Sequence, residues 1–178
     1  VIGIKTNEIN ELIKSQQNQQ AVCEIANDNA EGQIIISGDK SAVESLKIIL
    51  KEKKIKSIPL KVSAPFHCSL MKPAAEKMKK KIDQIIFKNP LYKIVNNVTA
   101  NPEIDSMIIK KLLIDQIFST VKWRESLINM SQAGVKNFIE IGPGRVLTGM
   151  VKRTIKKANC FPINSITDIK NLKDEFKK

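Results

Sequence analysis

The chain contains a single histidine, His67, and this residue is its clearest candidate for chemistry. His67 lies in a polar, proline-containing segment, residues 63–69, that follows an extended stretch of chain. Loops that follow strands often carry catalytic groups. An imidazole with an ordinary pKa of about 6.5 can accept or donate a proton near neutral pH, so His67 is a candidate general base or acid. A lone histidine is more often structural, and this residue by itself leaves both interpretations open.

The thiol beside His67 suggests a nucleophile, but its position argues against one. Neighbouring side chains of an extended chain point to opposite faces, whereas a nucleophile and its base must lie within hydrogen-bond distance. We therefore predict that Cys68 is a small buried residue. The chain has three cysteines, Cys23, Cys68 and Cys160, which are too scattered for a disulfide framework. They indicate a reducing, cytoplasmic location, and a single histidine argues against a metal centre.

A glycine-rich turn, Gly142-Pro143-Gly144, stands between a predicted strand and a predicted helix. Such a turn can bind an anion at the amino-terminal end of the helix. However, no Gly-Lys-Ser/Thr of a phosphate-binding loop follows it, and the spacing of a dinucleotide-binding fingerprint is missing. The sequence favours a purely structural turn.

The chain is basic, with 30 Lys and Arg against 18 Asp and Glu and a net charge of +12. A nucleic-acid-binding surface is one interpretation, and scattered lysines on solvated helix faces are the other. The first is weakened because aromatic residues, on which single-stranded RNA stacks, make up only 4% of the chain. No apolar run approaches the ~20 residues that cross a bilayer, and no hydrophobic leader opens the sequence. We therefore expect neither nucleic acid nor a membrane as a partner.

The elements that would position His67 follow a recognisable order. Residues 1–62 alternate as strand, helix, strand, strand, helix and extended chain, and this β-α-β-β-α-β order is that of the ferredoxin-like unit. We predict that the second strand covers residues 21–26 and that a turn at residues 27–32 separates it from the third. The helices show apolar stripes at spacings of three and four residues, such as Ile9, Leu12 and Ile13. Beyond them we predict helices at residues 71–86, 107–118, 123–132 and 146–157, and strands at 92–98 and 137–141. Strands that alternate with helices favour an α/β class with a parallel sheet.

Five blocks of the chain carry a recognisable pattern. They are NDNAEGQ (27–33), VSAPFHCSLMKPA (62–74), VNNV (95–98), VKW (121–123) and IEIGPGRVLTGM (139–150). Taken in order, these blocks resemble one family, the malonyl-CoA:acyl carrier protein transacylases. The most informative block is the segment around His67, which resembles the segment that carries the catalytic histidine of that family. The pattern of residues 1–61 resembles its small subdomain.

The resemblance implies a fold and a mechanism. It implies an α/β protein with a ferredoxin-like small subdomain, residues 1–61, and the C-terminal part of an α/β-hydrolase-like acyltransferase large subdomain, residues 62–178. The family transfers malonyl groups from CoA to the phosphopantetheine thiol of acyl carrier protein through a serine and a histidine, without a cofactor. On this resemblance His67 is the general base and Gln116 orients it through its main-chain carbonyl. Asn27 matches an asparagine near the substrate pocket, and Phe66 beside His67 could shape that pocket.

The departures from the family are equally informative. The family's serine lies in a Gly-His-Ser-x-Gly elbow, preceded by a Gly-Gln-Gly-Ser-Gln segment and followed by an arginine for the malonyl carboxylate, and none of these is in this chain. We therefore expect the chain to correspond to the carboxy-terminal portion of such an enzyme, to be inactive alone, and to work with a missing amino-terminal part.

Two alternatives remain open at this stage. The chain could be an inactive remnant that only binds acyl carrier protein, or, less favoured, a basic nucleic-acid-binding domain. Because acyl carrier protein is acidic in this family, the cations of the predicted helix 146–157 are a candidate docking surface. They are Lys152, Arg153, Lys156 and Lys157.

Overall fold

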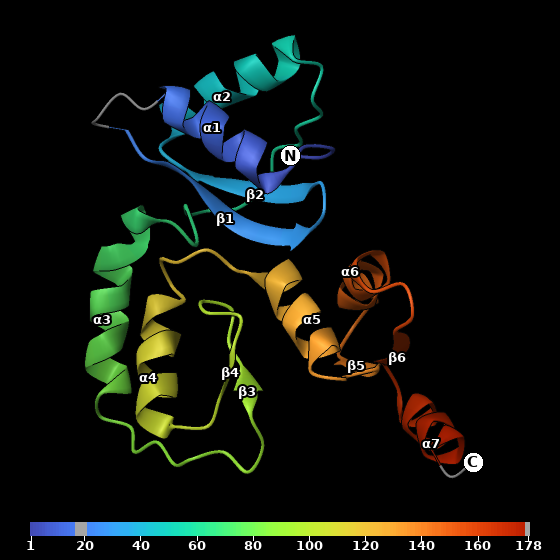
Figure 1. Ribbon diagram of the computed structural model, residues 1–178. Helices are drawn as coiled ribbons and strands as arrows, with labels where there is room; N and C mark the ends of the chain where they lie inside the picture. The colour runs from blue at the N-terminus through green and yellow to red at the C-terminus, as the bar shows by residue number, and fades with distance from the viewer. Residues whose placement is uncertain (17–20, 177–178) are drawn as a thin grey trace. The chain divides into compact units, whose positions relative to one another are not determined.

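The computed structural model describes residues 1–16 and 21–176, and the chain divides into two compact units, Val1–Ser126 and Leu127–Lys178 (Figure 1). The domain boundary that we predict after residue 61 lies inside the first unit and stays a prediction. The class is α/β, as predicted.

The first unit begins with the ferredoxin-like connectivity. Strand β1 (Cys23–Ala30) pairs antiparallel with β2 (Gln33–Gly38), and helices α1 (Thr6–Gln16) and α2 (Lys40–Glu52) contact these two strands (Figure 1). The first and last predicted strands of this unit are each reduced to one bridged residue, Ile2 in the first and Lys56 in the last. Ile2 pairs antiparallel with both Gln33 and Lys56. Gly3, with φ +84°, ends the first of them by turning the chain. The spatial order is nevertheless that of the predicted β-α-β-β-α-β unit.

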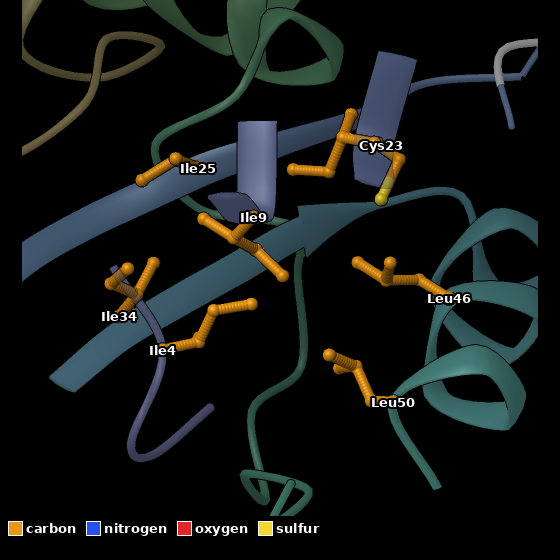
Figure 2. Packing of buried hydrophobic residues seen from close by; sticks show 8 residues of the cluster. Ile4, Ile9, Cys23, Ile25, Ile34, Leu46 and Leu50 are labelled. Atoms are coloured by element: carbon orange, nitrogen blue, oxygen red, sulfur yellow. The ribbon is translucent and has the colours of Figure 1, made fainter. Parts of the chain in front are cut away.

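The apolar stripes predicted from the sequence form the core of this unit. Ile9 and Ile13 of α1 and Leu46 and Leu50 of α2 are buried. Their side chains meet those of the strands (Figure 2). The buried cluster consists of Ile4, Ile9, Ile13, Cys23, Ile25, Ile34, Leu46 and Leu50.

Strand β1 is longer than the sequence suggests, since we predict a turn from residue 27 onward. Two irregularities in its pairing with β2 let it continue to Ala30. Its other edge is also paired, because the Asp28 amide donates to the carbonyl of Val121 at 2.9 Å and the Val121 amide donates to the carbonyl of Ala26 at 2.8 Å. Partners on both edges keep the polar residues of β1 extended.

The remainder of the first unit consists of short elements. A 3-10 turn η1 (Ser69–Met71) leads into α3 (Lys72–Ile82), and a small hairpin of β3 (Ile94–Val95) and β4 (Pro102–Glu103) precedes α4 (Ser106–Asp115). The predicted strand 92–98 is shortened because the Asn96 side chain accepts from the amides of Val98 and Thr99 and turns the chain back. The predicted helix 71–86 begins one residue later than its apolar pattern suggests, at Lys72, and ends four residues earlier, at Ile82.

The second unit is a parallel strand–helix–strand arrangement. Helix α5 (Trp123–Gln132) has the bounds that the sequence predicts. It begins in the first unit and ends in the second. Strands β5 (Asn137–Ile141) and β6 (Asn159–Ile163) pair in parallel and are joined by α6 (Val146–Thr154). The parallel sheet expected of the α/β class is limited to this pair among the described residues, since β1–β2 and β3–β4 are antiparallel. The sequence analysis did not identify β6 or the final helix α7 (Ile166–Glu175). A signal for α7 was present, since Ser165 and Asp168 form a capping box at its start.

Among the described residues, no helix combines the length and the apolar character needed to cross a membrane.

Candidate active site

His67 lies in the turn that connects the extended segment after α2 to η1. Its backbone φ is +60°, in the left-handed region that residues other than glycine seldom adopt. Its amide donates to the carbonyl of Ile117 at 3.3 Å, and its side chain is half-buried. Unusual backbone angles are retained only where the surroundings impose them, and they concentrate at functional sites.

The imidazole of His67 contacts the residue that the resemblance assigns to it. Nδ1 lies 3.0 Å from the main-chain oxygen of Gln116, which is 49 residues away in sequence. Gln116 is the C-cap of α4, and the last carbonyls of a helix lack partners within the helix. A carbonyl can only accept a hydrogen bond, so this contact holds the proton on Nδ1 and leaves Nε2 free to accept another.

The side-chain amide of Gln116 gives a longer, secondary contact. Its Nε2 lies 3.4 Å from Nδ1 of His67. An amide nitrogen cannot donate to a ring nitrogen that already carries its proton. The carbonyl contact is therefore the one that determines the tautomer.

Strand β1 anchors the two segments that meet at this contact. Downstream of Gln116, the hydroxyl of Thr120 donates to the carbonyl of Ile25 at 2.6 Å, next to the pairing of Val121 with β1. Downstream of His67, Ser69 donates its amide and its hydroxyl to the carboxylate of Glu24 at 2.9 and 2.6 Å. The sequence analysis did not identify Glu24 or Ser69, since nothing in their local pattern connects them.

The cysteine beside His67 is fully buried, as predicted. Cys68 has no exposed surface, and its Sγ donates to the carbonyl of Pro65 at 3.1 Å. Burial, together with the nearby charge of Glu24, raises the pKa of the neighbouring Cys23 thiol to about 11. Neither thiol has the exposed, electropositive surroundings that make a cysteine nucleophilic.

The other two predicted site residues are Phe66 and Asn27. Phe66 directly precedes His67 and its side chain is 45% exposed. Asn27 lies on β1, opposite Ile35 of β2 and bridged to Val121 through its main chain. Within the described part of the chain, no hydrogen bond joins Asn27 to His67. The substrate-binding roles of Phe66 and Asn27 stay predictions.

The turn Gly142-Pro143-Gly144 is structural, as the sequence favours. The carboxylate of Glu140 accepts from the amides of Leu147 and Thr148 at 3.0 and 2.7 Å. The chain's own carboxylate thus occupies the helix amides that an external anion would need.

A cavity of about 340 Å³ lies between α1, β1 and residues 120–125, and His67 does not line it. Four of its charged side chains have partners within the chain, and one of them is Glu24, which binds Ser69. Asp28 is paired with Arg124 at 2.7 Å, and Lys122 with Glu125 at 3.6 Å. Over residues 1–16 and 21–176, no cluster of three His, Cys, Asp or Glu side chains is placed to hold a metal ion.

Comparisons with known proteins place this geometry in context. No protein-family model matches the chain. Malonyl CoA-acyl carrier protein transacylase of Haemophilus influenzae is 35% identical over 177 residues, covering 99% of this chain and 56% of the relative. The protein of the same name from Bacillus subtilis is 36% identical over 165 residues, covering 92% of this chain and 52% of the relative. The chain thus spans about half the length of the curated relatives that it matches.

Solved structures agree with these sequence matches. An acyl carrier protein S-malonyltransferase from Vibrio cholerae has a TM-score of 0.91 at 38% identity, covering 96% of this chain and 56% of that chain. The corresponding enzyme from Bartonella henselae has a TM-score of 0.93 at 35% identity, covering 100% and 57%. A malonyl-transacylase solved in complex with a type II polyketide synthase acyl carrier protein has a TM-score of 0.91 at 34% identity, covering 98% and 57%.

Proposed function

We propose, from the premise that this chain belongs to the malonyl CoA-acyl carrier protein transacylase family, that it supplies the general base of a malonyltransferase active site. The nucleophilic serine would come from polypeptide outside this chain. The observation that carries the proposal is the 3.0 Å contact between Nδ1 of His67 and the carbonyl of Gln116. This contact leaves Nε2 as the free basic nitrogen.

The proposed reaction uses His67 in two half-reactions. In the first, Nε2 takes the serine hydroxyl proton while the serine oxygen attacks the malonyl thioester carbon. The carbon–sulfur bond then breaks, and the imidazolium returns the proton to the CoA thiolate. In the second, Nε2 takes the proton of the phosphopantetheine thiol on acyl carrier protein. The thiolate attacks the malonyl-serine ester, and the serine oxygen leaves with that proton.

The carbonyl of Gln116 fits a positioning role in both halves. It accepts from Nδ1–H whether the ring is neutral or protonated, so the ring keeps its orientation throughout the cycle. A thioester is already activated toward a thiol, so this chemistry needs no metal or redox cofactor. Malonyl-CoA and acyl carrier protein are the proposed substrates, with Asn27 and Phe66 near the acyl group.

Exposed apolar side chains support the proposal that another polypeptide completes the enzyme. Ile86 is 88% exposed, Leu91 92% and Tyr92 83% in the first unit, and Ile141 is 83% exposed in the second. Large apolar side chains that remain open to water are typical of surfaces that another chain covers.

The test supplies that polypeptide separately. The chain is mixed with a second polypeptide that carries the relatives' serine-containing remainder, and association is measured before transfer of malonyl from CoA to acyl carrier protein. We expect activity only in the mixture. His67→Ala should lower kcat by about 10²- to 10⁴-fold, the usual contribution of general-base catalysis. Lys51→Ala, which changes an exposed charged residue of α2, serves as the control and should have little effect.

Three outcomes would overturn the proposal. A loss below about tenfold for His67→Ala would show that His67 is not the base. Activity of the chain alone that survives His67→Ala and disappears in Cys68→Ala would assign the chemistry to the thiol. A mixture that associates and binds acyl carrier protein without transferring malonyl would favour the inactive remnant.

A further inference from the structure

We propose that Glu24 is a positioning residue for His67, which acts through Ser69. Its catalytic consequence rests on the proposed function, but its effect on the imidazole does not. Glu24 lies on β1, 45 residues before Ser69 in sequence. Its two carboxylate oxygens each accept one hydrogen bond from Ser69, at 2.9 Å from the amide and at 2.6 Å from the hydroxyl.

These bonds supply what the start of η1 lacks. The first amides of a helical turn have no acceptor within the turn. Cys68, the N-cap of η1, makes no side-chain capping bond. The carboxylate of Glu24 therefore caps the turn from a neighbouring strand, and hydrogen bonds to a charged acceptor are among the stronger ones in proteins.

The capped turn begins only two residues after His67. The left-handed backbone of His67 is strained and persists only while its surroundings impose it. Its tethers are the bond from its own amide to Ile117, the bond from Cys68 Sγ to Pro65, and the Ser69–Glu24 pair. The pair with Glu24 is the one among these three that attaches the turn to the sheet.

Strand β1 connects this tether to the other half of the contact. Three consecutive residues of the strand bind the two segments: Glu24 binds Ser69, Ile25 binds Thr120, and Ala26 binds Val121. The strand thus sets the separation between the His67 turn and the segment that follows Gln116. Loss of the Glu24 tether should let the turn move relative to the Gln116 carbonyl.

The single histidine of the chain allows a direct test. The imidazole is labelled with ¹⁵N in the full chain, and long-range NMR spectra report its tautomer. The wild type should show a proton on Nδ1. Glu24→Ala and Ser69→Ala should both shift the ring toward the tautomer mixture of a solvated imidazole. Glu24→Gln should restore part of the wild-type spectrum, because an amide oxygen still accepts one bond and its nitrogen can donate to the Ser69 hydroxyl.

The control separates positioning from general stability. Asp39→Ala removes a 2.7 Å bond to the Val22 amide beside the start of β1 but leaves the Ser69 contacts untouched. It should leave the tautomer unchanged. A wild-type spectrum in a folded Ser69→Ala chain, or an equal shift in Asp39→Ala, would overturn the proposal. Ser69→Ala keeps the test decisive even if Glu24→Ala does not fold.

A second measurement uses the complemented enzyme. Glu24→Ala should lower kcat between about 10- and 100-fold, since small misplacements of a catalytic group have effects of this size. The KM for malonyl-CoA should change much less. A KM effect with unchanged kcat would contradict the proposal. If His67→Ala leaves activity intact while the spectra change as expected, the proposed function fails and the positioning of the ring by Glu24 stands.

Discussion

His67 and Gln116 meet through different parts of their structure, a side chain from one and a main-chain carbonyl from the other. The identity of the side chain at position 116 therefore matters less than the place where α4 ends. The amide of Gln116 donates to the carbonyl of Leu112 at 2.9 Å, which holds that end in place. A residue with any side chain that preserves this bond would present the same carbonyl to the imidazole.

This reasoning yields a prediction at the residue scale. Gln116→Ala retains the carbonyl and removes only the 3.4 Å side-chain contact. In the complemented enzyme its effect on kcat should be small, within about threefold, far below the general-base contribution expected for His67. Steady-state kinetics of the two variants side by side provide the measurement. A loss for Gln116→Ala as large as that for His67→Ala would mean that the side-chain amide takes part.

At the scale of elements, the turn between β5 and α6 shows how a carboxylate takes the place of a bound anion. Hydrogen bonds from the hydroxyl and amide of Thr148, and from the amide of Leu147, lower the pKa of Glu140 below its ordinary value of 4.5. The folded unit thus favours the charged carboxylate. This stabilisation is fully present above the pKa of the unfolded chain, and it is lost as the pH falls through the lower pKa of the folded chain.

We predict a pH-dependent effect of Glu140→Gln. The variant should be less stable than the wild type at pH 7. The difference should shrink as the pH falls below the ordinary value of 4.5 and through the lower pKa of the folded chain, because the wild-type carboxyl is progressively protonated over that range. Urea unfolding followed by circular dichroism at neutral and acidic pH measures both free energies. Asp83 and Asp168 also have lowered pKa values and are common to both proteins, so the difference isolates Glu140. A difference that does not change with pH would show that the capping charge is unimportant.

At the scale of the whole molecule, the net charge of +12 indicates either a surface that binds an anionic partner or lysines that are simply solvated. The predicted docking surface needs one correction. We expected all four cations to lie on the helix predicted at residues 146–157, but α6 ends at Thr154, and Lys156 and Lys157 lie beyond it. The helix stops there because Ile155 turns to an extended conformation and leads the chain into β6. All four cations are nevertheless exposed.

We still predict that these four cations form the docking surface for acyl carrier protein. We expect binding of acyl carrier protein to the complemented enzyme to weaken between 0.1 M and 1 M salt, as the Debye length falls from about 10 Å to about 3 Å. Replacement of the four cations by alanine should weaken it further, mainly through the association rate. The variant carries Lys152→Ala, Arg153→Ala, Lys156→Ala and Lys157→Ala.

A matched control removes the same charge elsewhere. Four exposed lysines of α3 and the segment after it, Lys77, Lys80, Lys81 and Lys88, are changed to alanine. Surface plasmon resonance compares the three proteins at both salt concentrations. If the control weakens binding as much as the docking variant, net charge and not location is responsible. If neither salt nor the docking variant changes the rate, acyl carrier protein binds elsewhere.

The sequence by itself determined the features that depend on local pattern. Apolar spacing identified α1, α2 and α5, the order of elements identified the ferredoxin-like connectivity, and residue type singled out His67. These succeed because periodicity and side-chain chemistry are properties of neighbouring residues.

Only the tertiary structure decided how residues far apart in sequence meet. Val121 pairs with the edge of β1 that does not pair with β2, and β1 continues past residue 27, where a turn is predicted. Glu24 caps a helical turn 45 residues away. The family resemblance implied the contact of His67 with Gln116, but its geometry depends on where α4 ends and on a left-handed backbone angle. None of these has a local signal, because a carboxylate or carbonyl can accept from any donor that the chain's path brings to it.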